Sequence, residues 1–175
     1  MSFVKTLAAV SVMAFCYNVM AATDIYTGKV NFTGIVENAA CAISAGDVNG
    51  QTVNLGNVRL AEISGSAGKA SAAKTSFTIT LEDCSSVVSS RAAIKFTGNT
   101  APNMDNILVG TGIGVGIQIF DNVSAAPLVF GTNSSAYELS NGQNTLDFKA
   151  GFASTTATPE AGAVTATANF QVNYL

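Results

Sequence analysis

The sequence predicts an all-β protein folded as an antiparallel β-sandwich. Short segments in which apolar and polar residues alternate recur along the chain, which is the pattern of half-buried strands. Stretches rich in Gly, Ser, Asn, Asp and Pro separate these segments, and none keeps the apolar spacing of a helix over several turns. About eight such strands in a chain of domain size indicate two packed antiparallel sheets.

The first 21 residues have the features of a secretory signal peptide. Lys5 precedes an apolar run, Thr6 to Phe15, that is too short to span a bilayer. Small residues favour cleavage after Ala21, with Ala22 as the alternative. Removing 21 of the 175 residues leaves about 154, which is enough for one domain with a substantial core. No later stretch of 18 apolar residues follows, so we expect an exported protein that is not embedded in the membrane.

The stretch from Lys29 to Glu37 is predicted to be a strand with one narrow apolar face. Its apolar row consists of Val30, Phe32, Gly34 and Val36. A glycine inside a strand costs stability unless a bulge or a closely approaching backbone requires the missing side chain. We therefore expect this stretch to insert between other backbone segments.

The remaining strands follow from the same alternation. We expect them at 51–55, 76–81, 92–97, 113–120, 128–130 and 145–152, and finally at 163–175, where the apolar row is Val164, Ala166, Ala168, Phe170, Val172 and Tyr174. Pro127 places the 128–130 strand at a sheet edge. Two loops are expected, at 60–73 with at most one short helical turn and at 99–106. An irregularity near Asp83 would bring Cys84 into phase with the strand before it.

The sequence argues against catalysis and against nucleic-acid binding. The chain has no histidine, and Glu82 and Asp83 are strand neighbours that point to opposite faces. The glycine-rich stretch 110–116 lacks the spacing of a phosphate-binding loop and runs into a strand. We expect its glycines to remove side chains from one face of that strand, with Ile113, Val115, Ile117 and Ile119 on the other face. Eight basic residues without a cluster, against eleven acidic ones, leave a net charge of -3 and no surface that could follow a phosphate backbone. We expect no enzyme activity, cofactor, metal or nucleic-acid partner.

The cysteine count favours one disulfide. Cys16 lies within the predicted signal peptide, and Phe15 before it is too large for a lipoprotein signal, so lipidation is the weaker alternative. Cys41 and Cys84 remain as an even pair in an exported chain without histidine or a third thiol, which favours a disulfide over a metal site. Two unrelated buried thiols are the remaining alternative.

Four stretches resemble the major subunit of type 1-like fimbriae assembled by the chaperone–usher pathway. They are Gly34 to Cys41, Phe77 to Cys84, Val115 to Asp121 and the ending Phe170 to Leu175. The resemblance covers essentially the whole chain after the signal peptide. It includes the penultimate residue Tyr174 and Gly162, the fourteenth residue from the end.

This resemblance implies an incomplete immunoglobulin-like sandwich that lacks its last strand. A donor strand from a neighbouring subunit would complete the fold, so the chain would comprise a signal peptide (1–21), a donor-strand extension (22–37) and a pilin domain (38–175). The donor residues would be Val30, Phe32, Gly34 and Val36. The C-terminal groove strand, which would also contact the chaperone, includes Gly162, Phe170, Val172, Tyr174 and Leu175.

The resemblance also implies the partners and the location of the protein. We expect a structural subunit that passes through the periplasm and polymerises into the shaft of an adhesive fimbria on the bacterial surface. A minor adaptor subunit of the same kind of fimbria is the alternative. The partners would be further copies of the chain, a periplasmic chaperone, an outer-membrane usher, and tip or adaptor subunits.

Overall fold

The computed structural model describes residues 29–32, 39–124 and 126–175. All its helices and strands lie in the unit from Glu37 to Leu175. The predicted signal peptide, together with Gly34 and Val36, lies outside the described residues. The elements are β1 (Ala42–Ile43), α1 (Ala45–Val48), α2 (Leu60–Ile63), β2 (Thr75–Cys84), β3 (Arg91–Thr97), β4 (Thr100–Ala101), β5 (Met104–Val109), β6 (Val115–Asp121), β7 (Tyr137–Glu138), β8 (Gly142–Ser154) and β9 (Asn169–Tyr174).

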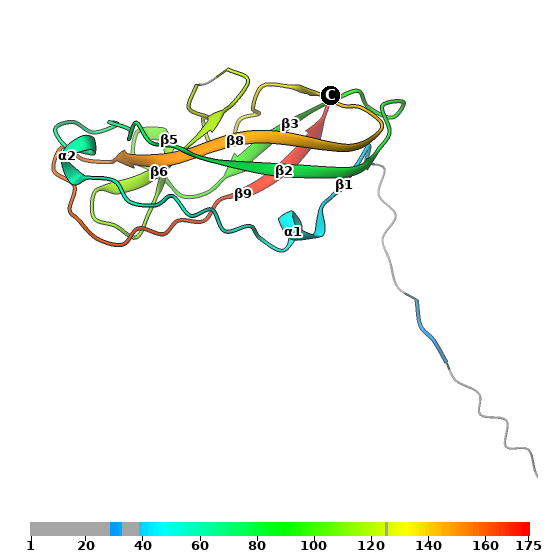
Figure 1. Cartoon of the computed structure of the whole chain (residues 1–175), viewed down its shortest axis with the longest axis horizontal. Coiled ribbons are helices and arrows are strands. Elements are labelled where there is room, and N and C mark those ends of the chain that lie inside the picture. The colour runs from blue at the N-terminus through cyan, green and yellow to red at the C-terminus, as the bar shows by residue number, and fades with distance from the viewer. Residues whose placement is uncertain (1–28, 33–38, 125) are drawn as a thin grey trace, which may run out of the picture. The chain divides into compact units, whose positions relative to one another are not determined.

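The strands form two antiparallel sheets, as predicted (Figure 1). The larger sheet has the order β1-β2-β8-β6-β5-β4, and the smaller has the order β7-β3-β9. Every pair of neighbouring strands is antiparallel. The fold is therefore the antiparallel β-sandwich that the alternating segments predict.

Side chains from both sheets meet in one hydrophobic core. Phe148 of β8 is fully buried, and its ring lies edge-on to that of Phe96 from β3, with the ring centroids 5.1 Å apart. Phe77 of β2 stacks on the same Phe148 ring at 5.7 Å. Ile79, Leu81, Ile94 and Leu146 complete the centre of this cluster. These are the inward positions of the alternating rows, so the pattern correctly predicted which faces of β2, β3 and β8 are buried.

The irregularity predicted near Asp83 is present. The pairing of β2 with β8 is continuous from Thr75 to Leu81, and its register then shifts before Cys84 pairs with Gly142. Asp83 takes a positive φ of 51° at this shift. The bulge turns Cys84 back toward the interior, where its side chain is buried.

Several predicted strands of the domain differ from the structure. The 51–55 and 128–130 segments form no strand, because neither has a ladder partner among the described residues beyond the isolated bridge of Pro127 to Phe120. The final strand is shorter than predicted. Its ladder with β3 covers only Asn169–Tyr174, although the alternation between half-buried and exposed residues continues back to Val164.

The structure also contains strands that alternation did not predict. The expected loop at 99–106 includes β4 and the start of β5, and the short β7 was missed as well. Helix α2 is the single short turn expected within 60–73, whereas α1 was not anticipated. In the glycine-rich stretch, Gly116 lies against the backbone of Leu108, and a Cβ at this position would lie 2.6 Å from Ile107 Cγ2. The expectation that a glycine removes side-chain bulk from a strand is thus correct for Gly116, while Ile113 lies in an exposed turn.

Candidate functional site

The smaller sheet ends at β9, and an apolar groove lies beyond this strand. Within the described part of the chain, β9 has a strand partner on one edge only, since β3 is its sole neighbour in the sheet. The position next to β9 is therefore where a further strand would complete the smaller sheet.

The groove opens directly into the core. Its wider section has a volume of about 480 Å³. One rim is formed by α1 and the 50–55 segment, the other by the residues from Ala166 to Phe170. The floor consists of side chains from both sheets, namely Phe77, Ile79, Phe96, Leu108, Ile117, Ile119 and Ala150. Several of these belong to the core cluster, so the missing strand would cover the interior of the sandwich.

A second, narrower section lies along the chain just before β9. It has a volume of about 310 Å³, and its walls come from the 56–63 segment and from residues 160–164. Because 160–164 leads into 166–170, the two sections follow one another along the same rim. Val115 and Phe152 contribute apolar surface here. Together the two sections form a groove that could hold an extended segment. We call this groove the β9 groove.

The apolar row that leads into β9 is only half covered. Val164, Ala166, Ala168, Phe170, Val172 and Tyr174 are each partly exposed, while the residues between them up to Gln171 are exposed. Phe170 and Val172 pack against the main core from one side. A strand with one apolar face normally buries that face, so this row lacks part of its cover.

The C-terminal residues are fixed in place at one end of the sandwich. The Leu175 N–H donates to the Arg91 carbonyl oxygen at 2.9 Å, and the Ser89 hydroxyl donates to the Leu175 carbonyl oxygen at 2.9 Å. The Tyr174 hydroxyl donates to the Cys41 carbonyl oxygen at 3.0 Å. Burial raises the pKa of Tyr174 even though this hydrogen bond opposes the effect. These contacts hold the rim strand against the start of the domain.

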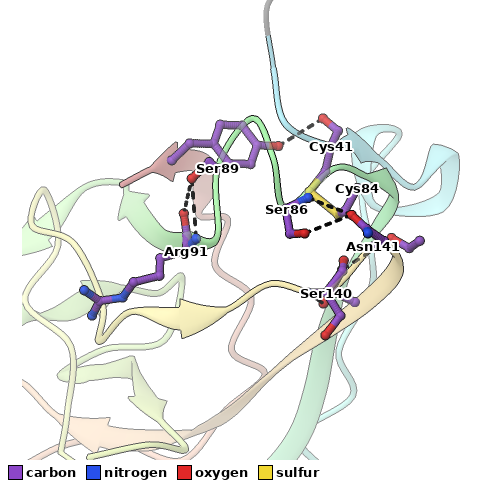
Figure 2. Close-up of a disulfide and its surroundings, with 10 residues drawn as sticks. Cys41, Cys84, Ser86, Ser89, Arg91, Ser140 and Asn141 are labelled. Carbon is purple, nitrogen blue, oxygen red and sulfur yellow. Dashed lines mark hydrogen bonds between the residues drawn. A yellow bond between two sulfur atoms is a disulfide. The ribbon is translucent and has the colours of Figure 1, made fainter.

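The predicted disulfide joins Cys41 to Cys84 in the structure (Figure 2). It links Cys41, the residue before β1, to Cys84, the last residue of β2, at the end of β2 where β1 pairs over only two residues. The Ser86 N–H and hydroxyl both donate to the Asn141 side-chain oxygen, at 2.9 and 3.0 Å, which ties the neighbouring turn to the start of β8. The segment that precedes the domain is thus anchored covalently where it enters the fold.

The structure places the predicted site residues as follows. Phe170 lines the wide section of the groove, and Gly162 lines the narrow one. Val172 and Tyr174 pack on the core, whereas Leu175 is exposed at the chain end. Val30 and Phe32 are 71% and 91% exposed, and Lys29 to Phe32 form no strand within the chain.

The alternating pattern did not predict the rim of the groove opposite β9. Val53 and Leu55 were assigned to an ordinary strand, but they are half-buried and line the groove from the side opposite β9. The alternation of this segment was a valid signal for one apolar face. It gave no indication that the segment has no neighbouring strand among the described residues. No group of three His, Cys, Asp or Glu residues that could hold a metal ion occurs in the part of the chain that the structure describes.

Comparison with known proteins identifies the family. The model of the fimbrial protein family matches residues 30–175. This chain is a fimbrial protein. It is 41% identical to the type-1 fimbrial protein A chain of Escherichia coli K12 and 40% identical to the type 1 fimbrial subunit of Klebsiella pneumoniae, with 98% of each chain covered in both comparisons.

Solved structures agree with this assignment. A structure of a chaperone–usher pilus that addresses rod uncoiling has 25% identity and a TM-score of 0.66, covering 86% of this chain and 96% of its own. The rod subunit PapA of the P pilus shares the fold, with 23% identity and a TM-score of 0.68 over 78% of this chain and all of its own. The fimbrial protein described here is a structural subunit of the shaft of a bacterial surface fimbria. The adaptor alternative receives less support, because the relatives that match over nearly their whole length are type-1 fimbrial subunits.

Proposed function

We propose that this fimbrial protein polymerises head to tail, each copy inserting its N-terminal extension into the β9 groove of the next copy. The observation that carries the proposal is the open apolar groove beside the free edge of β9. An extended segment that enters it gains main-chain hydrogen bonds from the strand edge and burial of alternate side chains. The extension, residues 22–37, offers Val30, Phe32 and Val36 in such a row.

Apolar burial and ladder hydrogen bonds stabilise a joint between copies, and the ordering of the flexible extension, at about 1–2 kcal/mol per residue, opposes them. Burial of each of these three side chains contributes about 1.5–3 kcal/mol, and each added ladder hydrogen bond about 0.5–1.5 kcal/mol net. Val30 and Phe32 are exposed in the single chain, so their burial is still to be gained. The donor and the groove are different surfaces of one molecule, and such a contact propagates as a filament instead of closing as a dimer.

The inserted strand runs antiparallel to β9 in this proposal. Every strand pair in both sheets is antiparallel, and an antiparallel ladder is slightly more stable per residue than a parallel one. The C-terminal end of the donor, near Val36, then lies at the narrow section of the groove, beside residues 160–164. Its N-terminal end lies toward Phe170.

An unassembled subunit needs protection for this groove. A chain with so much exposed apolar floor would aggregate, and a periplasmic chaperone that lends a strand to the groove would prevent this. An outer-membrane usher would then exchange that strand for the extension of the next subunit. Likeness to a chaperone–usher pilus supports this route, with tip or adaptor subunits as further partners.

Substitution of Gly34 by valine tests the donor. In the proposed register Gly34 crosses a shallow part of the neighbour's groove, so the added side chain would overpack the joint at a cost of about 1–3 kcal/mol. Because the extension precedes the domain, Gly34→Val is expected to leave chaperone-bound subunit at its normal level while fibre length falls sharply. Co-purification with the chaperone and fibre counts by electron microscopy measure the two effects.

Gly28→Val is the matched control, since Gly28 lies on the same alternating row six residues earlier. It is expected to have the smaller effect on fibre length. If Gly28→Val shortened the fibres and Gly34→Val did not, the residues that occupy the groove would lie nearer the N-terminus than proposed. Normal fibres from a chain that lacks residues 24–37 would overturn the proposed function altogether.

A further inference from the structure

We propose that each joint contains a second contact, in which an apolar turn at Val87 and Val88 packs on the opposite end of the next copy, against Ile113 and Leu60. This inference rests on the proposed function, because it assumes that the extension enters a neighbour's groove. It adds an interaction surface to the joint and assigns its occupant, a second copy of this chain.

The two ends of the sandwich are defined by β8. Gly142 at its start pairs with Cys84, and Ser154 at its end pairs with Val115. Thirteen residues separate the ends by about 40 Å at roughly 3.3 Å per residue. We call the end with the disulfide the proximal end and the end with α2 the distal end; Figure 1 shows α2 and β1 at opposite ends of the sandwich.

The proximal turn presents two valines on a rigid frame. Val87 is 92% exposed and Val88 is 56% exposed. The frame consists of serines whose polar groups are used internally: the Val88 N–H donates to the Ser85 carbonyl oxygen at 3.0 Å, and the Ser86 side chain is bonded to Asn141. Figure 2 shows this turn beside the disulfide. Turns favour Gly, Asn, Asp and Ser, so two exposed β-branched apolar residues at a fixed tip are unusual.

This turn lies where the extension joins the domain. The Ser85 N–H donates to the carbonyl oxygen of Ala40 at 2.8 Å, and Ala40 is the first buried residue of the domain. Four residue steps separate Val36 from Ala40, which is at most about 14 Å of extended chain. When Val36 occupies a neighbour's groove, the Val87 turn is therefore held close to the end of that groove.

The groove end in question is the distal end of the neighbour. With the donor antiparallel to β9, Val36 lies beside residues 160–164, and the narrow section of the groove there is also lined by Leu60. Ile113 borders the same place, because the Glu160 N–H donates to its carbonyl oxygen at 3.0 Å. Ile113 is 65% exposed and Leu60 is 37% exposed. The apolar tip of one copy and this apolar surface of the next thus come together at each joint.

Photo-crosslinking in assembled fibres tests the contact directly. Benzoylphenylalanine replaces Val87 in the full chain, and isotope-labelled and unlabelled subunits are mixed so that links between copies are recognised by mass. The expected product joins position 87 of one copy to residues 109–114 or 57–63 of another. The same probe at Val123, which is 60% exposed on a turn at neither end, is the control. Links from position 87 to any other surface, or only within one copy, would overturn the inference.

A substitution measures the contribution of the contact. Val87→Ser with Val88→Ser removes the apolar tip and leaves the extension intact, so fibres are still expected, but with an equilibrium constant per joint lowered at least roughly tenfold. Dissociation of fibres in rising denaturant gives this value, and Val123→Ser is expected to match the wild type. Wild-type joint strength in the double variant would refute the second contact while leaving the donor strand in place. If deletion of residues 24–37 abolishes polymerisation while the double valine variant still polymerises, the effect of the donor strand is distinguished from that of the second contact.

Discussion

Asp121 is the most deeply buried charged group among the described residues. Its carboxylate, with no exposed surface, accepts hydrogen bonds from the N–H groups of Val123 at 2.8 Å and Ser135 at 2.7 Å. The Tyr137 hydroxyl, which donates to the Asp147 carbonyl oxygen at 2.8 Å, lies 3.3 Å from the same carboxylate. Burial alone would raise the pKa of Asp121, but these hydrogen bonds outweigh it and hold the pKa below its ordinary value of 3.8. The Asp121 side chain therefore bonds to both ends of the segment that connects β6 to β7, at Val123 and at Ser135.

Replacement of Asp121 by asparagine is expected to destabilise the subunit. The amide keeps one acceptor and leaves at least one buried N–H without a partner, which costs about 1–3 kcal/mol. Because the folded-state pKa of Asp121 is lowered, its contribution is present above pH 3.8 and is lost as the pH falls through the folded pKa. Urea unfolding of the wild type and of Asp121→Asn between pH 7 and pH 2 measures both effects. Equal slopes of stability against pH below pH 4 in the two proteins would contradict this role.

Gly116 is a position where any side chain is expected to be costly. A Cβ there would meet the Leu108 carbonyl oxygen and lie 2.6 Å from Ile107 Cγ2, so β5 and β6 would have to separate. Gly116→Ala is expected to lower the free energy of unfolding by about 1–3 kcal/mol. Gly46→Ala, where no atom lies within 4 Å of the new Cβ, is the control and is expected to be neutral or slightly stabilising. Equal unfolding midpoints for the two variants would show that the strand pair adapts.

Residue-level prediction succeeded where the signal was local. The close packing at Gly116 could be predicted, because a glycine within an alternating strand indicates that another backbone segment comes close to it. Asp121 could not be predicted to be buried, because its partners at Ser135 and Tyr137 come from 14 and 16 residues further along the chain. An aspartate that ends a strand before a turn is ordinarily exposed.

At the scale of elements, alternation identified the strands that have one buried face. It predicted β2, β3 and β8, whose inward residues form the aromatic core. It missed β5, because this strand buries Ile107 and Leu108 in succession and so breaks the period of two. It predicted a strand at 51–55, which has the alternating pattern but no partner strand in the part of the chain that the structure describes. Alternation of apolar and polar residues predicts that one face of a segment is buried. A β-strand also needs a neighbouring strand to hydrogen-bond with, and alternation does not predict that neighbour.

Removal of the disulfide is expected to weaken the element that begins the domain. Cys41 and Cys84 are 43 residues apart, and closing a loop of this length stabilises the folded state by about 4 kcal/mol on the chain-entropy model. Replacement of both cysteines by serine is therefore expected to lower the free energy of unfolding by a similar amount and to reduce the recovery of subunit. Thermal unfolding of the chaperone-free domain and quantitative recovery from the periplasm provide the measurements. The wild-type protein under reducing conditions is the control, and it is expected to behave like the double variant.

At the scale of the whole molecule, the β9 groove is open because no described strand pairs with the outer edge of β9. Composition and periodicity could place the row from Val164 to Tyr174 on one face, but a half-covered row and a fully covered row have the same sequence pattern. The resemblance to fimbrial subunits supplied the expectation of a missing strand. The structure adds the rim at Val53 and Leu55 and the division of the groove into two sections.

A covalent copy of the extension is expected to complete the fold. Grafting residues 24–37 behind Leu175 through a flexible linker lets the copy fold back antiparallel to β9. We expect a soluble monomer that no longer polymerises and whose Tm is higher by about 4–8 °C, since a gain of roughly 2 kcal/mol shifts Tm by about 2–4 °C per kcal/mol at this size. Calorimetry and size-exclusion chromatography test this outcome.

A graft that carries serine in place of the copied Val30 and Phe32 is the control for linker effects. It is expected to leave Tm and polymerisation close to those of the ungrafted chain. If the unmodified graft changed neither Tm nor polymerisation, the idea that this extension supplies a missing strand of the sandwich would be wrong.

The position of the disulfide determines how the subunit bears mechanical load. In the proposed fibre, tension enters each domain through the extension, at Ala40 and Cys41, and β1 on its own would peel from β2 through only two residue pairs. The bond from Cys41 to Cys84 transmits the pull to β2 instead, whose ladder with β8 begins at Thr75 and ends at Cys84. Force applied along these strands loads their hydrogen bonds together in shear and does not open them one after another. The cross-link thus protects the two-residue pairing of β1 with β2 from separating under tension in each subunit of the proposed fibre.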